Sequence, residues 1–591
     1  MMMVNGINNP AAGTLAKKPR RAGQKTGLKT ALLMSPLLLL SGVALAQAQG
    51  VPKPKGASAL PHNLPSAVPG GAAKHLAPAG VPKSVQPHVL VQGVSLVGND
   101  VFSNAKLMQL LPSLPAELAL SDLDNMADKV TAYYRSRGYP FARAYFAPQT
   151  SSDGKLVMTI IEGRFGKVNV TNSSPLHNRL AQRIIEENLC ASGPDCIGAP
   201  ITTRGIERSA LLLYDQPGVY VASTMARGES FGTADFDVAA TKGQRLQFRT
   251  GFDNYGSPTT GVWRGALGAS VNELLGRGDQ LSIDAVGSGQ QLWNALASYS
   301  LLLTPSGLRG GVSVARTHYQ LGGAFRDLGV EGMANTVSAS LVYPLVRGLN
   351  QNLNAGLTYE HQSLHDNIDG VDYYARRKVD DGILSLSGDS TDHWLGTSNN
   401  KFSLAFMHGV VHGLDADTLA SDQDPTYGLF TKGAFNKLTF ILNRQQQLVG
   451  PVSLYGGVNG QWASKNLASA ERFYIGGPSG VRAYPVGEAG ADSGAVGTVE
   501  LRYIMPFRGV SYSKITLAAF YDNGWIRRNQ NPPPGVTDNI ADYQDVGVRV
   551  RLEKAGRFGM SAMWAHSLGN EKSQIDPGAN DRFWLQFAFQ F

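Results

Sequence analysis

FYIGGPSGVRAYPVGEAGADSGAVGTVE, residues 473–500, is a glycine-rich segment that lies between two strand-like segments. Glycine allows backbone conformations that other residues avoid, so this segment can fold back on itself. Its central residue, Arg482, presents five donors in a rigid fork and keeps its charge, so within a protein it needs a carboxylate. The best candidate is Asp522, in the later strand-like segment ITLAAFYDNG. The sequence therefore predicts an ion pair that fixes the glycine-rich segment against a later strand.

The chain from about Gly243 to its end has the pattern of a transmembrane β-barrel. Segments of ~10 residues with alternating character are separated by Gly, Pro, Asn and Asp, which is the signature of such barrels. We count sixteen segments, an even number as a closed bacterial barrel requires. The last one, FWLQFAFQF, places five apolar side chains on one face: Phe583, Leu585, Phe587, Phe589 and Phe591. A soluble all-β sandwich explains this apolar face poorly, so we predict a mostly β fold with a 16-stranded outer-membrane barrel in residues 243–591.

The connections between these segments alternate between short and long. With the N-terminal part of the chain in the periplasm, the short turns lie on the periplasmic side and the long loops outside. The glycine-rich segment falls between the eleventh and twelfth strands, so it belongs to the sixth external loop. We call residues 463–497 loop 6 and predict that it folds into the barrel lumen.

The N-terminal segments predict export. A basic region ends at Lys29 and precedes an apolar run and the small-x-small pattern Ala44-Leu45-Ala46, which is typical of a secretory signal peptide in residues 1–46. The run is short and contains Pro36, which argues against a membrane anchor. Residues 47–87 are rich in proline and predict an extended linker.

The formal charge of +8 comes from these segments, because residues 1–88 hold ten basic residues and no acid. Residues 89–591 carry −2, so the basicity is no argument for nucleic-acid binding.

Residues 88–163 and 164–242 predict two similar modules. In the first, a strand is followed by two helices and two strands, with helical spacing clearest in SDLDNMADKVTAYYRSRG. The second repeats the order β-α-α-β-β and contains both cysteines of the chain, Cys190 and Cys196. Their close spacing in an oxidising compartment favours a disulfide over free thiols or a metal site.

Several motifs together resemble one family of outer-membrane proteins. The two modules resemble POTRA domains, and the opening barrel pattern DNYGSPTTGVWRG with NELLGRGDQL resembles the first strands of two-partner secretion transporters. Loop 6 matches the same family through Gly476-Gly477 and Val481-Arg482-x-Tyr484, and the segment FYDNG matches through Phe520, Asp522 and Gly524. The chain is thus similar to the TpsB family (the ShlB/FhaC/HecB hemolysin secretion/activation family), within the superfamily that includes BamA. One departure is Ala483, where the family usually has Gly.

The resemblance implies a function and a site. It implies export of a large TpsA-type exoprotein, an adhesin or hemolysin, from the periplasm to the cell surface of a Gram-negative bacterium without nucleotide. It implies a lumen latch formed by Arg482, Asp522, Val481, Tyr484, Gly477, Phe520 and Gly524. It also implies that Phe591, with Phe589 and Phe587, forms the signal read by the barrel-assembly machinery, with periplasmic chaperones and outer-membrane lipid as further partners. Relatives carry an N-terminal helix that plugs the pore, and the prolines of residues 51–87 disfavour such a helix here.

Two other functions stay open. A factor that inserts other barrels is less consistent with only two modules, and a general diffusion porin explains neither the modules nor the latch. No nucleophile and base are placed together in a recognisable pattern, so we expect no enzyme activity, no cofactor, no metal site and no nucleic-acid partner.

Overall fold

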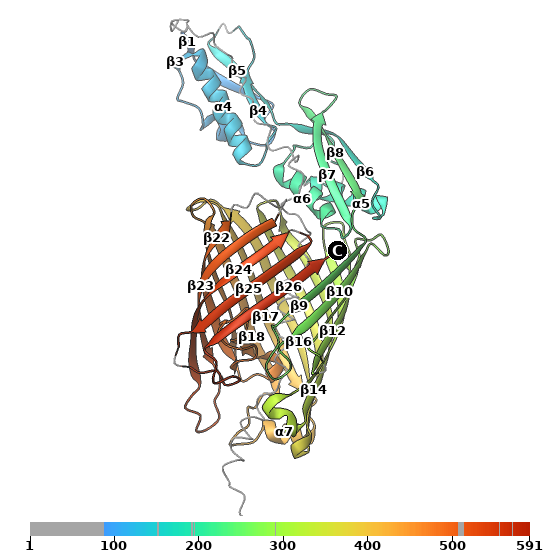
Figure 1. Ribbon diagram of the computed structural model, residues 1–591. Helices are drawn as coiled ribbons and strands as arrows, with labels where there is room; N and C mark the ends of the chain where they lie inside the picture. Colours follow the sequence, from blue (N-terminus) through green and yellow to red (C-terminus); the bar gives the residue numbers. More distant parts are fainter. Residues whose placement is uncertain are drawn as a thin grey trace, which may run out of the picture.

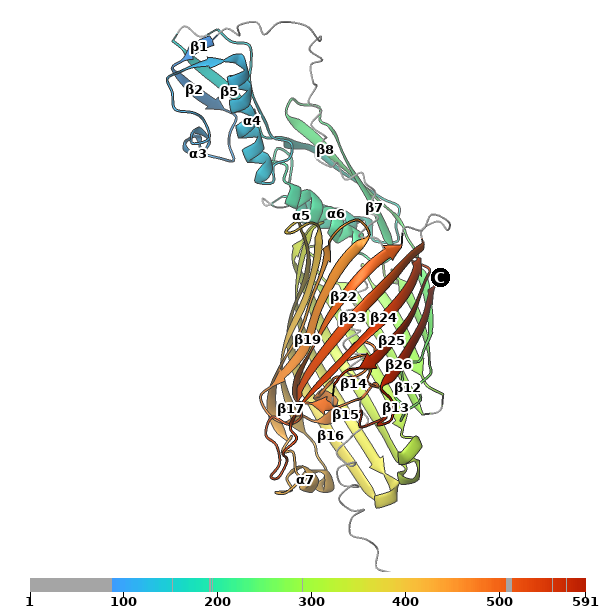
Figure 2. The same cartoon turned by 60° about the vertical axis from the view of Figure 1, so that its left-hand side comes forward.

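A computed structural model describes residues 88–591, except residues 151–152, 191–192, 194, 290, 506–512, 555 and 570. Two modules lie one after the other at one end of a closed barrel, and helix α7 (Ala416–Asp422) lies at the opposite end (Figures 1 and 2). The predicted signal peptide and linker, and the expectation that the linker disfavours a plug helix, concern residues outside the described part of the chain. Within these residues, none of the helices is long and apolar enough to cross a lipid bilayer.

The first module differs in two respects from the predicted β-α-α-β-β order. The opening strand is divided into β1 (His88–Val91) and β2 (Gly93–Val97), and an additional short strand, β3 (Ala116–Ala119), pairs with β1. The sequence prediction missed β3 because a four-residue strand has too little alternation to be recognised. The other elements are α3 (Asn104–Met108), α4 (Leu120–Ser136), β4 (Arg143–Phe146) and β5 (Lys155–Ile161).

Helix α4 packs its apolar face on the sheet of the first module. The sheet has the order β2-β5-β4, with β2 and β5 parallel. The core joins helical residues such as Met126 and Val130 to strand residues such as Met158, all nearly inaccessible to solvent. Buried residues recur about every 3.6 residues on α4 and at every second residue on β5, so the apolar faces of the two elements are turned toward each other.

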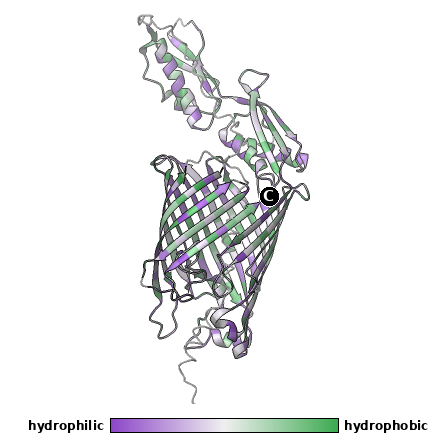
Figure 3. Cartoon of the chain, in the orientation of Figure 1, coloured by the Kyte–Doolittle hydropathy of each residue, from purple (hydrophilic) through white to green (hydrophobic). Residues whose placement is uncertain are grey.

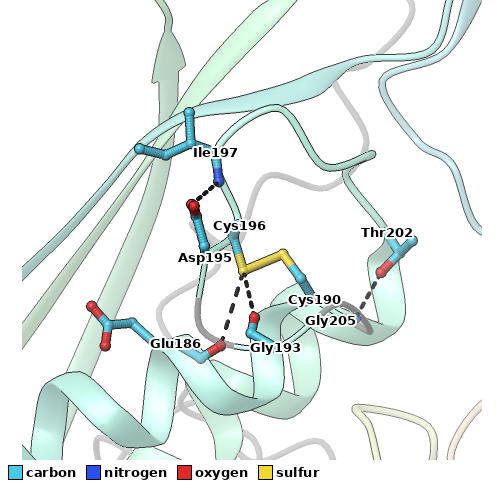
Figure 4. Close-up of a disulfide and its surroundings, with 8 residues drawn as sticks. All are labelled: Glu186, Cys190, Gly193, Asp195, Cys196, Ile197, Thr202 and Gly205. Carbon is cyan, nitrogen blue, oxygen red and sulfur yellow. Dashed lines mark hydrogen bonds between the residues drawn. A yellow bond between two sulfur atoms is a disulfide. The ribbon is translucent and has the colours of Figure 1, made fainter.

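The second module has the predicted order. Its elements are β6 (Arg164–Asn172), α5 (Asn178–Leu189), α6 (Thr203–Tyr214), β7 (Val219–Arg227) and β8 (Thr233–Lys242). The sheet order is β6-β8-β7, and both helices bury apolar residues against it. Cys190 and Cys196 form a disulfide in the connection between α5 and α6, and Cys196 belongs to the core of the module (Figure 4).

Replacing both cysteines by alanine is expected to loosen the second module. The bond closes a short loop, and in the chain-entropy model a loop of this size contributes about 2 kcal/mol to the free energy of unfolding. Amide hydrogen exchange of α5 and α6 in the full-length chain should become faster, and treatment of the wild type with reductant should have the same effect. Unchanged exchange in both experiments would contradict the prediction.

The two modules are joined by a polar cluster. Buried Glu162 accepts hydrogen bonds from the Tyr134 hydroxyl (2.9 Å) and from the backbone N–H of Val101 (2.7 Å). Arg164, the first residue of β6, donates to Glu162 and to Asp100 of the first module. Burial raises the pKa of Tyr134 above its usual range, and the hydrogen bond to Glu162 adds to this rise. The junction is therefore an ordered contact between the modules.

Sixteen antiparallel strands close into a barrel, as predicted. Hydrophobic and hydrophilic residues alternate along many of them (Figure 3), as expected where one face meets lipid and the other the lumen. The strands are β9 (Leu246–Asp253), β10 (Arg264–Asn272), β11 (Gln280–Gly287), β12 (Leu292–Leu302), β13 (Arg309–Gln320), β14 (Val330–Arg347), β15 (Gln351–Ile368), β16 (Tyr373–Asp392), β17 (Ser398–His412), β18 (Gly433–Gln447), β19 (Val452–Ala463), β22 (Ser493–Met505), β23 (Ser513–Arg527), β24 (Ile540–Lys554), β25 (Phe558–Ser567) and β26 (Asp581–Gln590).

The barrel closes by pairing of β26 with β9. Phe587 is the register partner of Phe252, and Phe589 that of Thr250. Phe591 extends this pairing, because its backbone exchanges two hydrogen bonds with Phe248. The C-terminal residues are therefore part of the closing seam, and the exposed Phe591 ring is available on the surface.

The second module is fixed to the short turns at the nearer end of the barrel. Asp215, directly after α6, accepts two hydrogen bonds of 2.7 Å from Arg347 at the end of β14. Arg208 of α6 donates to the carbonyl oxygens of Ser306 and Pro344, each at 3.0 Å. The module nearest the membrane is thus held in one orientation over the barrel.

Candidate functional site: loop 6 and the lumen wall

The part of loop 6 that lies outside the barrel strands runs from Ser464 to Asp492, between β19 and β22. It contains a 3-10 turn, η3 (Ser469–Glu471), and a small antiparallel pair, β20 (Phe473–Tyr474) with β21 (Gly490–Ala491). The tip folds back on itself, since the N–H of Gly477 donates to the Tyr484 carbonyl oxygen at 2.9 Å. Gly477 has a φ of 100°, which glycine adopts without strain. The motif glycine is therefore needed for the turn that presents Arg482.

Arg482 is held by two carboxylates of the barrel wall. Its Nε and Nη2 donate to Asp522 of β23 at 2.7 and 2.8 Å, in a bidentate pair. Its Nη1 donates to Glu500 of β22 at 2.8 Å. The exposed fractions of Arg482, Glu500 and Asp522 are 4%, 2% and 0%. Bidentate pairs between ions are among the stronger hydrogen bonds, so this contact fixes the tip of the loop.

Aromatic side chains complete the setting of Arg482. Its guanidinium lies 3.5 Å from the ring centroid of Phe520, which gives a cation–π contact. The indole N–H of Trp584 donates to the Arg482 carbonyl oxygen at 2.7 Å. Tyr484 is buried and donates to the carbonyl oxygen of Glu571 at 2.9 Å. The side chain, the backbone and the following tyrosine are therefore all fixed.

The loop tip packs closely on the wall at Gly524. A Cβ atom at this position would lie 2.5 Å from Ile475 Cδ1 and 2.7 Å from Val481 Cγ2. Both apolar side chains are fully buried. Gly524 therefore provides the space that lets the loop approach the strand.

Further contacts hold the loop to its neighbours. Glu488 accepts hydrogen bonds from Ser573 (2.5 Å) and from the backbone N–H of Gln574 (2.8 Å), in the loop between β25 and β26. Asp492 accepts from Arg472 at 3.1 Å and ties the two ends of the loop together. Loop 6 is thus bonded to the wall and to a second external loop.

The structure brings seven sequence-selected residues together: Gly477, Val481, Arg482, Tyr484, Phe520, Asp522 and Gly524. The others lie elsewhere, with the cysteines in the second module and Phe587, Phe589 and Phe591 on the closing strand. Sequence reasoning missed Glu500, Asp545 and Trp584. Glu500 and Asp545 are charged residues at inward positions of predicted strands. Their position on the lumen side is the sequence feature from which they could have been predicted.

Ala483, where the resemblance predicts glycine, is accommodated in the site. It is 2% exposed, and its N–H donates to Asp545 at 2.6 Å. Changing Ala483→Gly keeps this hydrogen bond and adds backbone freedom, so we expect a cost of at most about 1 kcal/mol in loop stability and nearly normal export. The pore conductance of the purified variant should match the wild type. A permanently open pore would show that the methyl group is essential.

Comparison with known proteins agrees with this geometry. The family model "Haemolysin secretion/activation protein ShlB/FhaC/HecB" matches residues 232–537, and the model "POTRA domain, ShlB-type" matches residues 89–163. The chain belongs to the ShlB/FhaC/HecB family. The first match covers the barrel strands from β9 to β23 together with loop 6, including Glu500 and Asp522, and ends before β24. The second covers the first module.

Individual ShlB/FhaC/HecB relatives are distant. The heme/hemopexin transporter protein HuxB of Haemophilus influenzae (strain 86-028NP) is 29% identical over 80% of this chain and 82% of its own length. The outer membrane transporter CdiB of Dickeya dadantii (strain 3937) is 22% identical over 69% of this chain and 70% of its own. The solved structure of CdiB from Escherichia coli shares the fold, with a TM-score of 0.70 and 18% identity over 98% of this chain and all of that one.

The family membership fixes the function in outline. The chain is an outer-membrane transporter of the two-partner secretion type, with its POTRA modules in the periplasm. It exports a partner protein to the cell surface. The alternative of a barrel-insertion factor is less well supported.

Proposed function

We propose that loop 6 is the movable part that closes the pore of this transporter and that Arg482 is its releasable latch. The supporting observation is the buried contact of Arg482 with both Asp522 and Glu500. If the loop only filled the pore without moving, buried ions would give no advantage, because apolar side chains in their place are often as stable. We also propose that residues 88–163 and 164–242 are the two POTRA domains and that residues 243–591 are the barrel domain.

The exported protein enters from the periplasm as an unfolded chain. Open strand edges can bind such a chain through backbone hydrogen bonds. Within the described sheets, the edge strands are β2 and β4 in the first module and β6 and β7 in the second. The cargo we propose is a large TpsA-type exoprotein, whose folding outside supplies direction without a catalytic step. The barrel-assembly machinery and periplasmic chaperones are proposed as partners in biogenesis, with Phe591 as the assembly signal.

A reversible tether between loop and wall tests whether the loop moves. Asn459 of β19 donates to the carbonyl oxygen of Ser479 in the loop at 3.4 Å, so these positions are neighbours. Changing Asn459→Cys and Ser479→Cys and bridging them with a cleavable bifunctional thiol reagent should stop export, and cleavage should restore it. The two single variants, treated identically, are the controls. Full export through the bridged protein would refute loop movement.

A further inference from the structure

A second buried polar contact fixes the base of loop 6 to another part of the wall. Glu471, the last residue of η3, is 3% exposed. Its carboxylate accepts from Lys437 Nζ of β18 at 2.5 Å and from Gln362 Nε2 of β15 at 2.9 Å. Its carbonyl oxygen accepts from Lys437 at 3.2 Å and from Gln461 of β19 at 2.9 Å. One loop residue is thus bound by three strands.

This contact is separate from the Arg482 contact. The two share no side chain, because Arg482 binds β22 and β23 whereas Glu471 binds β15, β18 and β19. Different apolar clusters surround them. Leu467 and Ala468 at the loop base pack with wall residues such as Phe435, whereas Val481 at the tip packs in another cluster.

The charge around Glu471 is unbalanced. Glu360 shares the Gln362 amide with Glu471, and Asp381 of β16 is the register neighbour of Glu360. Asp381 is fully buried, and neither of its carboxylate oxygens has a hydrogen-bond partner in the described part of the chain. The charges that act on Asp381 are those of Glu471, Lys437, Glu360 and the adjacent Asp380. Three inward carboxylates therefore share one ammonium group.

No hydrogen bond in the described barrel wall explains why the Asp381 carboxylate is buried. It lies over the backbone of Gly409, where a Cβ atom would be 2.2 Å from its Oδ1. Burying a carboxylate without a partner is costly, and whenever Asp381 is ionised its charge repels Glu471 and competes with it for Lys437. Its effect is therefore to weaken the hold of Lys437 on Glu471.

We propose that Glu471 is a second anchor of loop 6, independent of Arg482, and that Asp381 keeps this anchor weak enough to be released. The anchor at Glu471 holds the base of the loop to the barrel wall, and the latch at Arg482 holds its tip. This inference rests on the proposed movement of loop 6. Lys437 acts by positioning Glu471, and Asp381 acts through its effect on Lys437.

Single engineered thiols can report the two anchors separately. Both native cysteines are in the disulfide, so an added cysteine is the only free thiol. Ala468 at the base and Ala483 at the tip are 1% and 2% exposed, and Ala468→Cys and Ala483→Cys place one reporter at each. The measured quantity is the rate of maleimide labelling of the folded, purified full-length protein.

Lys437→Met should raise the labelling rate of the Ala468→Cys reporter about tenfold or more, because Glu471 then lacks its cation. The Ala483→Cys reporter should keep its rate, and Lys437→Arg should restore the slow rate at the base. Lys514→Met is the control, since Lys514 also pairs with a glutamate, Glu553, but is exposed and 3.8 Å away. Equal labelling in Lys437→Met and wild type, or equal acceleration at both reporters, would overturn the second anchor.

Asp381→Asn tests whether Asp381 weakens the contact between Lys437 and Glu471. This test remains valid even if Lys437→Met fails to fold. The amide has nearly the same shape without the charge, so the Ala468→Cys reporter should be labelled more slowly than in the wild type. Unchanged or faster labelling would overturn the role of Asp381. These rates are measured without cargo, so they stand apart from secretion, and a failure of the proposed export leaves them unaffected.

Discussion

Arg482→Met is expected to open the pore and reduce export strongly. The change removes the cation that binds both Asp522 and Glu500. Glu500 keeps its ion pairs with Arg502 and Arg549, whereas the fully buried Asp522 loses its bidentate partner. Removing one partner of a buried ion pair costs about 3–5 kcal/mol, which is enough to shift a loop equilibrium by more than a hundredfold. Single-channel recordings of the purified variant should therefore show a larger and longer-lived open state than the wild type.

Two matched variants separate the latch from general effects of charge. Arg482→Lys keeps a cation without the bidentate fork, so it should fall between wild type and Arg482→Met. Arg444→Met removes an arginine that also binds a carboxylate, Asp392, but in a partly exposed pair. Solvent screens such exposed pairs and they contribute little to stability, so this variant should behave as wild type. A closed pore in Arg482→Met would contradict the latch.

Gly524→Val is expected to displace the loop without removing any charge. Even the first atom of the new side chain would meet Ile475 and Val481 at distances that no carbon pair tolerates. Overpacking of this kind costs about 1–3 kcal/mol, and here the loop is the part that can move away. The variant should show a more open pore and faster labelling of the Ala483→Cys reporter.

Gly497→Val is the control for this steric prediction. Gly497 lies on the neighbouring strand β22, and a Cβ atom there would have only the Asn523 carbonyl oxygen near it, at 3.9 Å. Both variants place valine in a barrel strand, where it is well tolerated. If Gly524→Val and Gly497→Val change the conductance equally, the close packing of loop 6 on Gly524 does not hold the loop in place.

The barrel could be predicted from the sequence because its pattern is local. Sixteen alternating segments were recognisable, including the last, where Phe587 and Phe589 face one way. The strand β3 was not, because four residues such as Ala116–Ala119 carry no clear period. Its pairing with β1 depends on the folded module.

The site was only partly predictable for a related reason. Arg482 and Asp522 stand in recognisable motifs and have opposite charges, which suggested their contact. Glu500 lies on a strand with ordinary alternation, and the sequence does not show which inward carboxylate faces the loop. The contact of Glu471 with Lys437 joins two segments without any motif, so only the barrel register brings them together.

The most direct test of export is the location of the partner exoprotein. A large exoprotein encoded beside this chain would be expressed in cells lacking the transporter, in cells carrying it and in cells carrying Arg482→Met, and then measured in periplasm and medium. We predict that the exoprotein stays in the periplasm without the transporter, reaches the medium with it, and is released poorly by Arg482→Met although the barrel is assembled. Normal release in cells without the transporter, with a change only in small-solute permeability, would contradict the account.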